Sequence, residues 1–273
     1  MDPVKRAFLG SFDASAISKV VIVGGLPRSG TTSLDATLHA RSDTFMCDEF
    51  HELRRLETRR FFNRLQHYHA GESRHWQDSE GRTWRGMGPD DYRLAAAHSL
   101  TQTLLSFSDP KKFRGKHSAE VDVFGFKHPR IEVGAMMFHN MFSPVQVHLV
   151  YVAREPVSVL RSIWEMSWTA ETDPAVFEES IQRDYAQSLQ HLQSLEGRGV
   201  HCHVFRTGLD TIDDLLGCLE LDRQVESGEI FSDTWPSERR RSVEPIPDDI
   251  VERFSNSETV VAFRQAMALS ATE

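Results

Sequence analysis

The chain has 273 residues, of which 40% are hydrophobic and 26% charged, a composition typical of soluble globular proteins. Its formal net charge of −9 disfavours nonspecific binding to nucleic acid or to anionic membranes. Residues 1–18 lack the apolar core of a signal peptide, and the three cysteines have no CxxC spacing, which argues against a disulfide framework. We therefore expect a cytoplasmic protein with neither a nucleic-acid nor a membrane partner.

Short apolar runs alternate with helical patterns along the chain. Residues 20–23 form a β-branched run closed by two glycines, which predicts a buried parallel strand. Strands that alternate with helices predict an α/β fold, in which a parallel sheet has helices on both faces. We expect four further strands at residues 44–47, 121–126, 147–153 and 200–205, and helices at residues 31–40, 89–107, 131–142, 157–168 and 174–196.

Two regions do not follow this alternation. About residues 50–118 carry few strand signals, which predicts a mainly helical insertion. Besides the helix at 89–107, this insertion should hold a helix at residues 52–70, a polar loop at 71–88 and a basic loop at 110–118. The tail, about residues 221–273, should be irregular and then helical from about residue 248. We expect residues 1–273 to form a single domain of this kind.

The most specific feature of the sequence follows the first predicted strand. Gly25-Leu26-Pro27-Arg28-Ser29-Gly30-Thr31-Thr32 has the spacing of a Walker A loop, GxxxxGK(S/T). Between a strand and a helix, successive backbone N–H groups and the helix N-terminus form an anion site. The Walker lysine, which reaches the terminal phosphates in nucleoside triphosphatases, is replaced by Thr31. The positive charge comes instead from Arg28, inside the loop.

The segment Pro27-Arg28-Ser29-Gly30-Thr31-Thr32 resembles the 5′-phosphosulfate-binding loop of sulfotransferases that use 3′-phosphoadenosine 5′-phosphosulfate (PAPS). This resemblance implies a fold similar to that of P-loop kinases, PAPS as the donor, and no metal ion. It also implies which loop residues bind the donor, namely Arg28, Ser29, Gly30, Thr31 and Thr32.

A second segment resembles the 3′-phosphate motif of the same family. Arg154-Glu155-Pro156 follows the strand predicted at residues 147–153, and Ser162 stands eight residues after Arg154, on the predicted helix. An arginine can grip a phosphate with two N–H groups, and a hydroxyl on the helix can donate a further hydrogen bond. The resemblance therefore assigns Arg154 and Ser162 to the 3′-phosphate.

Sulfuryl transfer needs positive charge at the sulfonate and at the departing oxygen, as phosphoryl transfer does. Lys127, in Phe126-Lys127-His128-Pro129, resembles the Lys-x-Pro signature in which the lysine contacts the bridging oxygen. Arg28 is expected to assist, because it should touch both the 5′-phosphate and the sulfonate.

The reaction also needs a base for the acceptor proton. The motif layout is closest to the tyrosylprotein and bacterial sulfotransferases, where a Cys-Gly-Glu-Glu-like segment supplies a catalytic glutamate, and Glu49 falls on that glutamate. His128 is the alternative base. A histidine close behind a lysine serves in the aryl and steroid branch, although one more residue separates the two there than here.

Two aromatic residues and a basic run could contribute to the site. Trp164 and Trp168 would share a helix face, either packed in the core or lining the acceptor pocket. Arg239-Arg240-Arg241 is either a solvated run or a basic loop of the kind that closes over the 3′-phosphate in many sulfotransferases.

Three further segments lack a complete set of functional residues. Within residues 204–209, Arg206 and Thr207 replace the Tyr and Glu of a Tyr-Glu-x-Leu pattern common in the family, so the contact made there should differ. The histidine-rich segments 67–75 and 201–203 lack a complete ligand set, so no metal is expected.

We therefore predict a PAPS-dependent sulfotransferase that uses in-line transfer and a glutamate base. The acceptor would be a hydroxyl or amine on a small molecule, a glycan or a peptide. A P-loop small-molecule kinase is the alternative, against which Thr31 counts, and a nonenzymatic protein that binds 3′-phosphoadenosine 5′-phosphate (PAP) is another. The sequence leaves the acceptor and the oligomeric state open.

Overall fold

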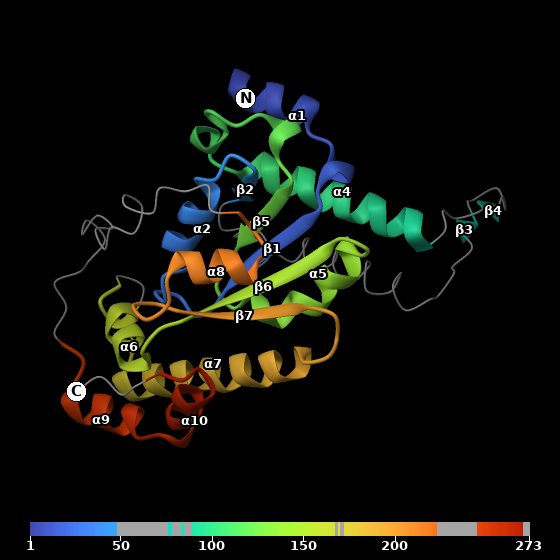
Figure 1. Ribbon diagram of the computed structural model, residues 1–273. Helices are drawn as coiled ribbons and strands as arrows, with labels where there is room; N and C mark the ends of the chain where they lie inside the picture. Colours follow the sequence, from blue (N-terminus) through green and yellow to red (C-terminus); the bar gives the residue numbers. More distant parts are fainter. Residues whose placement is uncertain are drawn as a thin grey trace.

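A five-stranded parallel sheet forms the centre of the molecule, with strand order β2-β5-β1-β6-β7 (Figure 1). The computed structural model describes residues 1–47, 76–77, 83–84, 89–166, 169, 172–222 and 245–269. The strands of the sheet are β1 (Lys19–Gly24), β2 (Thr44–Cys47), β5 (Val123–Lys127), β6 (Gln146–Ala153) and β7 (His201–Arg206). The predicted parallel sheet is confirmed.

Helices cover both faces of this sheet, which explains why all six residues of β1 are buried. Side chains alternate between the faces, so Val20 and Ile22 join one core while Val21 and Val23 join another. The first core includes α1 (Pro3–Ser11), α4 (Pro89–Phe107), α5 (Ala135–Phe142) and the end of α7 (Pro174–Leu195). The second includes α2 (Thr31–His39) and α8 (Ile212–Cys218).

A third core holds the helices nearest the carboxyl terminus against α7. It joins α6 (Pro156–Trp164), α7, α9 (Asp248–Ser255) and α10 (Glu258–Ala266) to the end of β6 (Figure 1). Short 3-10 helices lie at Ala14–Ala16, Pro110–Phe113, Ser118–Glu120 and Ile131–Gly134. No helix within the described ranges is long and apolar enough to cross a membrane.

The predicted bounds of several elements agree with those in the structure. The strand at 44–47 and the helix at 89–107 are confirmed as β2 and α4. The tail is helical from Asp248, as predicted. The helix predicted at 52–70 lies outside the described residues.

Three predictions of local structure were wrong. The loop predicted at 71–88 contains an antiparallel pair of short strands, β3 (Trp76–Gln77) and β4 (Thr83–Trp84). The physical reason is that tryptophan and threonine are favoured in strands. The loop predicted at 110–118 begins with the 3-10 turn Pro110–Phe113, because the Asp109 side chain accepts a hydrogen bond from the N–H of Lys111.

The helix predicted to reach residue 168 ends at Trp164. The Thr169 hydroxyl lies 2.7 Å from the carbonyl oxygen of Trp164, so a side chain binds the last carbonyl group of this helix. The first helix, α1, was not predicted. Its signal is the pair Asp2-Pro3, since Asp2 accepts a hydrogen bond from the N–H of Val4 and proline occupies the first turn.

Three histidines stack on strands β6 and β7. The His148 ring lies 4.8 Å from that of His201 and 5.2 Å from that of His203, and His148 Nδ1 is 3.0 Å from His203 Nε2. Only 3% of His148 is exposed. Burial lowers the pKa of His148 to about 3, and the nearby positive charge of Lys19 and the other two histidines add to this effect. The stack therefore favours the neutral form of His148.

We expect this stack to make the protein less stable in mild acid. The pKa of His148 is below its unfolded value of about 6.5, so the unfolded chain binds more protons between these values. The stabilisation is complete above pH 6.5 and is lost as the pH falls toward 3. Between pH 7 and pH 5 the free energy of unfolding, measured with urea, should fall by up to about 2 kcal/mol from this group. His148→Leu should flatten this slope, whereas the exposed control His117→Leu should not. Equal slopes in both variants would contradict the assignment.

Candidate functional site

The loop between β1 and α2 is a tight turn at the carboxyl end of the sheet. Three of its residues have positive φ: Gly25 (129°), Arg28 (70°) and Gly30 (108°). A Cβ atom at Gly25 would lie 2.5 Å from the carbonyl oxygen of Val152, so only glycine fits there. Gly30 is the N-cap of α2, so the turn leads directly into a helix N-terminus, as the sequence predicted.

Three carbonyl groups of this loop accept hydrogen bonds from other segments of the chain. These bonds come from the segments that follow β5, β6 and β7: Gly25 O accepts from Arg130 N (2.9 Å), Arg28 O from Arg154 Nη1 (3.2 Å) and Ser29 O from Thr207 Oγ1 (2.7 Å). The Leu26 carbonyl instead accepts from the N–H and the hydroxyl of Ser29, within the loop. In a planar trans peptide group the N–H points away from the C=O. Holding the Ser29 carbonyl outward therefore turns the Gly30 N–H toward the inside of the loop, as in an anion-binding nest. The Ser29 N–H is already hydrogen bonded to the Leu26 carbonyl.

The second predicted anchor lies beside this loop. Arg28 Nε donates to the hydroxyl of Ser162 at 3.0 Å, and Arg154 binds the Arg28 carbonyl. Residues that are 126 and 134 positions apart in the sequence thus meet. The structure therefore brings Arg28 of the first predicted anion site next to Arg154 and Ser162 of the second.

Glu155, the acidic residue of the second motif, has a structural role. Its carboxylate caps α6 by accepting a hydrogen bond from the N–H of Ser158 (2.8 Å) and pairs with Arg264 of α10 at 2.6 Å. This cap fixes where α6 begins and hence where Ser162 lies. The contribution of Arg264 was not predicted, because nothing in the sequence near either motif points to α10.

Lys127 is the last residue of β5 and faces the start of α2. Its Nζ lies 3.1 Å from the hydroxyl of Thr32, and only 6% of the residue is exposed. Strand pairing places Lys127 opposite Val23, immediately before the loop. The lysine predicted near the departing oxygen therefore lies at the same turn as Arg28.

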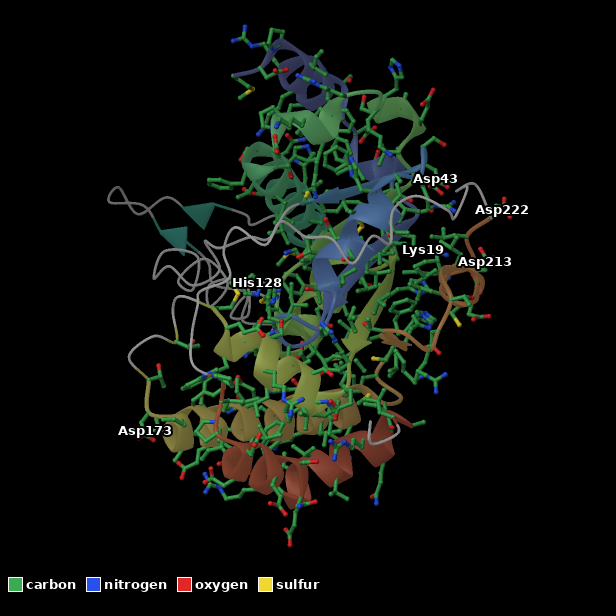
Figure 2. All side chains as sticks on the ribbon, turned by 90° about the vertical axis from the view of Figure 1, so that its left-hand side faces the viewer. Lys19, Asp43, His128, Asp173, Asp213 and Asp222 are labelled. Atoms are coloured by element: carbon green, nitrogen blue, oxygen red, sulfur yellow. The ribbon has the colours of Figure 1, made fainter. Side chains whose placement is uncertain are left out.

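His128 is buried directly after Lys127. His128 follows the carboxyl end of β5, whereas Lys19 begins the neighbouring parallel strand β1. The two residues therefore lie at opposite ends of the sheet (Figure 2). His128 Nδ1 is 2.6 Å from the carbonyl oxygen of Pro129. Because a carbonyl can only accept, Nδ1 must carry the hydrogen, and Nε2 is the basic nitrogen of the neutral ring.

A buried carboxyl lies behind the loop and was not predicted. Glu132 is 1% exposed, and its Oε1 accepts a hydrogen bond from the hydroxyl of Ser188 at 2.5 Å. A Cβ atom at Gly24 would come within 3.0 Å of its Oε2. Burial raises the pKa of Glu132, against the opposing effect of the Ser188 hydroxyl and of nearby backbone N–H groups. A carboxyl that favours its neutral form repels a bound anion less.

Several predicted site residues lie outside the described part of the chain: Glu49, Trp168 and Arg239-Arg240-Arg241. Trp164 is described, and its ring packs 5.2 Å from that of Phe177 against the third core, which agrees with a packing role. Within the residues whose placement is described, no group of three or more His, Cys, Asp or Glu side chains could hold a metal ion.

Comparison with known proteins identifies a family. A family model described as "Sulfotransferase family" matches residues 20–204, which is more than half of the chain. A search of curated proteins found no match to the chain.

Solved structures that match include the sulfotransferase domain from the curacin biosynthetic pathway, with 14% identity and a TM-score of 0.48 over 94% of this chain and 99% of that one. The sulfotransferase domain from the Synechococcus PCC 7002 olefin synthase has 11% identity and a TM-score of 0.47 over 93% and 96%. Sulfotransferase STF9 from Mycobacterium avium has 11% identity and a TM-score of 0.49 over 93% and 78%.

We expect Gly25→Ala to destabilise the protein, because the new methyl group would meet the Val152 carbonyl and the backbone would keep a positive φ. The loss in the free energy of unfolding should exceed about 1 kcal/mol in urea titrations. Gly10→Ala is the matched control. Gly10 lies in α1 with nothing near its would-be Cβ, so this variant should be neutral or slightly more stable. Equal effects of the two changes would contradict this account of the loop.

Proposed function

The chain belongs to the sulfotransferase family, and on that premise we propose that it transfers a sulfuryl group from PAPS to a hydroxyl or amine of an acceptor. The observation that carries this proposal is the direct contact between the two anion anchors, Arg28 Nε to Ser162 Oγ at 3.0 Å. PAPS carries a 3′-phosphate and a 5′-phosphosulfate on one ribose, so its binding needs two anion sites that lie close together.

The groups gathered at the loop fit an anionic donor. They are cations, hydroxyls and a helix N-terminus: Arg28, Arg154, Lys127, Thr32, Ser162 and the start of α2. Cationic N–H donors make the strongest hydrogen bonds to phosphate and sulfonate oxygens. By contrast, Thr31 stands where a kinase of this fold would have its lysine, and this favours the sulfotransferase over the kinase alternative.

Bound PAPS would supply a sulfuryl group whose bond to the bridging oxygen breaks as the acceptor atom bonds to sulfur. Lys127 would hold positive charge at the bridging oxygen, which leaves with PAP. Arg28 would hold the 5′-phosphate and the sulfonate. Arg154 and Ser162 would hold the 3′-phosphate. These roles resemble the electrostatic and positioning roles of residues in phosphoryl transfer.

Glu49 is proposed as the base that takes the acceptor proton. Support comes from β2, whose last residue, Cys47, pairs with Phe126 immediately before Lys127. Glu49 follows Cys47 by two positions in the sequence and itself lies outside the described residues. His128, the alternative base, is buried and hydrogen bonded to the neighbouring carbonyl group of Pro129.

The donor assignment predicts that the 3′-phosphate contributes to nucleotide binding without any divalent ion. PAP should bind more tightly than AMP by about 1.5–3 kcal/mol, the scale of hydrogen bonds to charged groups. Ser162→Ala should reduce this difference, as measured by titration calorimetry in EDTA. Ser158→Ala, on the same helix, is the control and should not. Equal affinity of the wild type for PAP and AMP would refute the assignment of Arg154 and Ser162, and tight binding of ATP only with magnesium would favour the kinase.

The base assignment predicts that Glu49→Gln keeps PAP affinity but loses turnover. General bases contribute typically about 10²–10⁴-fold, so the loss in kcat should fall in that range. The reaction would be followed with labelled PAPS on whichever acceptor a screen of phenols, amino sugars, glycans and tyrosyl peptides reveals. His128→Asn should cost much less. A nearly normal Glu49→Gln enzyme beside an inactive His128→Asn enzyme would transfer the role to His128. Protein that binds PAP but sulfates no acceptor class would support the nonenzymatic alternative.

A further inference from the structure

Thr207 is the first residue after β7 and contacts the phosphate loop. Its backbone N–H donates to the Ala153 carbonyl at 2.8 Å and so continues the pairing of β7 with β6. Its side-chain hydroxyl donates to the carbonyl of Ser29 at 2.7 Å, across 178 residues of sequence. The backbone of Thr207 is thus fixed by the sheet while its side chain holds the loop.

The turn that carries Thr207 is itself closed by an ion pair. The Asp210 carboxylate accepts hydrogen bonds from the Arg206 backbone N–H at 2.6 Å and from Arg206 Nε at 2.9 Å. The backbone N–H of Asp210 returns to the Arg206 carbonyl at 2.9 Å. These contacts hold the residues on either side of Thr207, so its hydroxyl is presented from a rigid turn.

The bond from Thr207 fixes the orientation of one particular peptide group. The Ser29 carbonyl and the Gly30 N–H belong to the same planar unit and point in opposite directions. A Cβ atom at Gly30 would lie 3.1 Å from Thr207 Oγ1, so the threonine is packed closely against this peptide. Gly30 has a φ of 108°, where a glycine peptide can rotate more easily than any other. An external hydrogen bond is therefore what selects one orientation.

We propose that Thr207 is a positioning residue for the donor, which acts by aiming the Gly30 N–H at the 5′-phosphate. This inference rests on the proposed function and deepens it. It also gives a role to a position where the chain departs from the Tyr-Glu-x-Leu pattern: Thr207 stands at the place of the Glu and binds a loop carbonyl, which a carboxylate could not do.

The test compares two nucleotides that differ only in the 5′-phosphate, PAP and adenosine 3′-monophosphate. Thr207→Val keeps the shape of the side chain and removes the hydroxyl, and we expect it to weaken PAP binding about tenfold. Thr207→Ser keeps the hydroxyl and should bind PAP within about threefold of wild type. Neither variant should change the affinity for adenosine 3′-monophosphate by more than about twofold, because that ligand has nothing for the Gly30 N–H to bind.

Thr37→Val is the matched control. Its hydroxyl also donates to a backbone carbonyl, that of Ser33 at 2.9 Å, but within α2. This variant should bind both nucleotides as the wild type does. Thr207→Ala provides a second hydroxyl-free variant should Thr207→Val fail to fold, and thermal unfolding of each variant reports its stability.

The outcomes separate this inference from the proposed function. Wild-type protein that binds neither nucleotide would refute the proposed function and, with it, the role of Thr207. Wild-type protein that prefers PAP, beside a Thr207→Val variant with unchanged PAP affinity, would overturn the inference alone. Equal losses for PAP and adenosine 3′-monophosphate would also overturn it, because they would show that Thr207 supports the fold of the whole site.

Discussion

The site depends on one constraint, which is that the carbonyl oxygens of Gly25, Arg28 and Ser29 in the loop after β1 are satisfied from outside. Backbone carbonyls that turned inward would repel an anion, and buried carbonyls without donors would be costly. Here the donors come from the residues that follow β5, β6 and β7. Strands β5 and β6 flank β1, and β7 is the next strand along. The order of the sheet therefore decides which segments can hold the loop open toward its ligand.

The same arrangement concentrates positive charge in an acidic protein. The chain carries a net charge of −9, yet Arg28, Arg154 and Lys127 meet around one turn. Close cations in a partly buried site repel each other, and hydroxyl and carbonyl acceptors offset part of that repulsion. Ser162 accepts from Arg28, and the Arg28 carbonyl accepts from Arg154. Behind the loop, burial raises the pKa of Glu132 and so shifts this carboxyl toward its neutral form.

Most of the sheet and the turn that carries the candidate site could be predicted from sequence, because local patterns of residues encode them. The β-branched run at 20–23 and the glycine spacing of the loop identify the strand, the turn and the helix that follows. The contacts of Thr207, Arg130 and Arg264 could not be predicted in this way. Each joins residues far apart in the chain, and a hydroxyl, a backbone N–H or an arginine is ordinary in its own segment. The early end of α6 could not be predicted for a similar reason, since a single threonine hydroxyl binds the carbonyl of its last residue, Trp164.

The wide separation of these contacts has a consequence for biosynthesis. A ribosome releases the loop at residues 25–30 long before it has made Thr207, which binds the loop from 178 positions downstream. Strand β6, which pairs with β1, and Arg154 also emerge late. During translation the loop can therefore form its glycine turn but cannot fix its peptide orientations. A nascent chain should gain affinity for nucleotide only after β7 has left the exit tunnel and joined the sheet, so ligand binding reports the completion of folding and not its beginning.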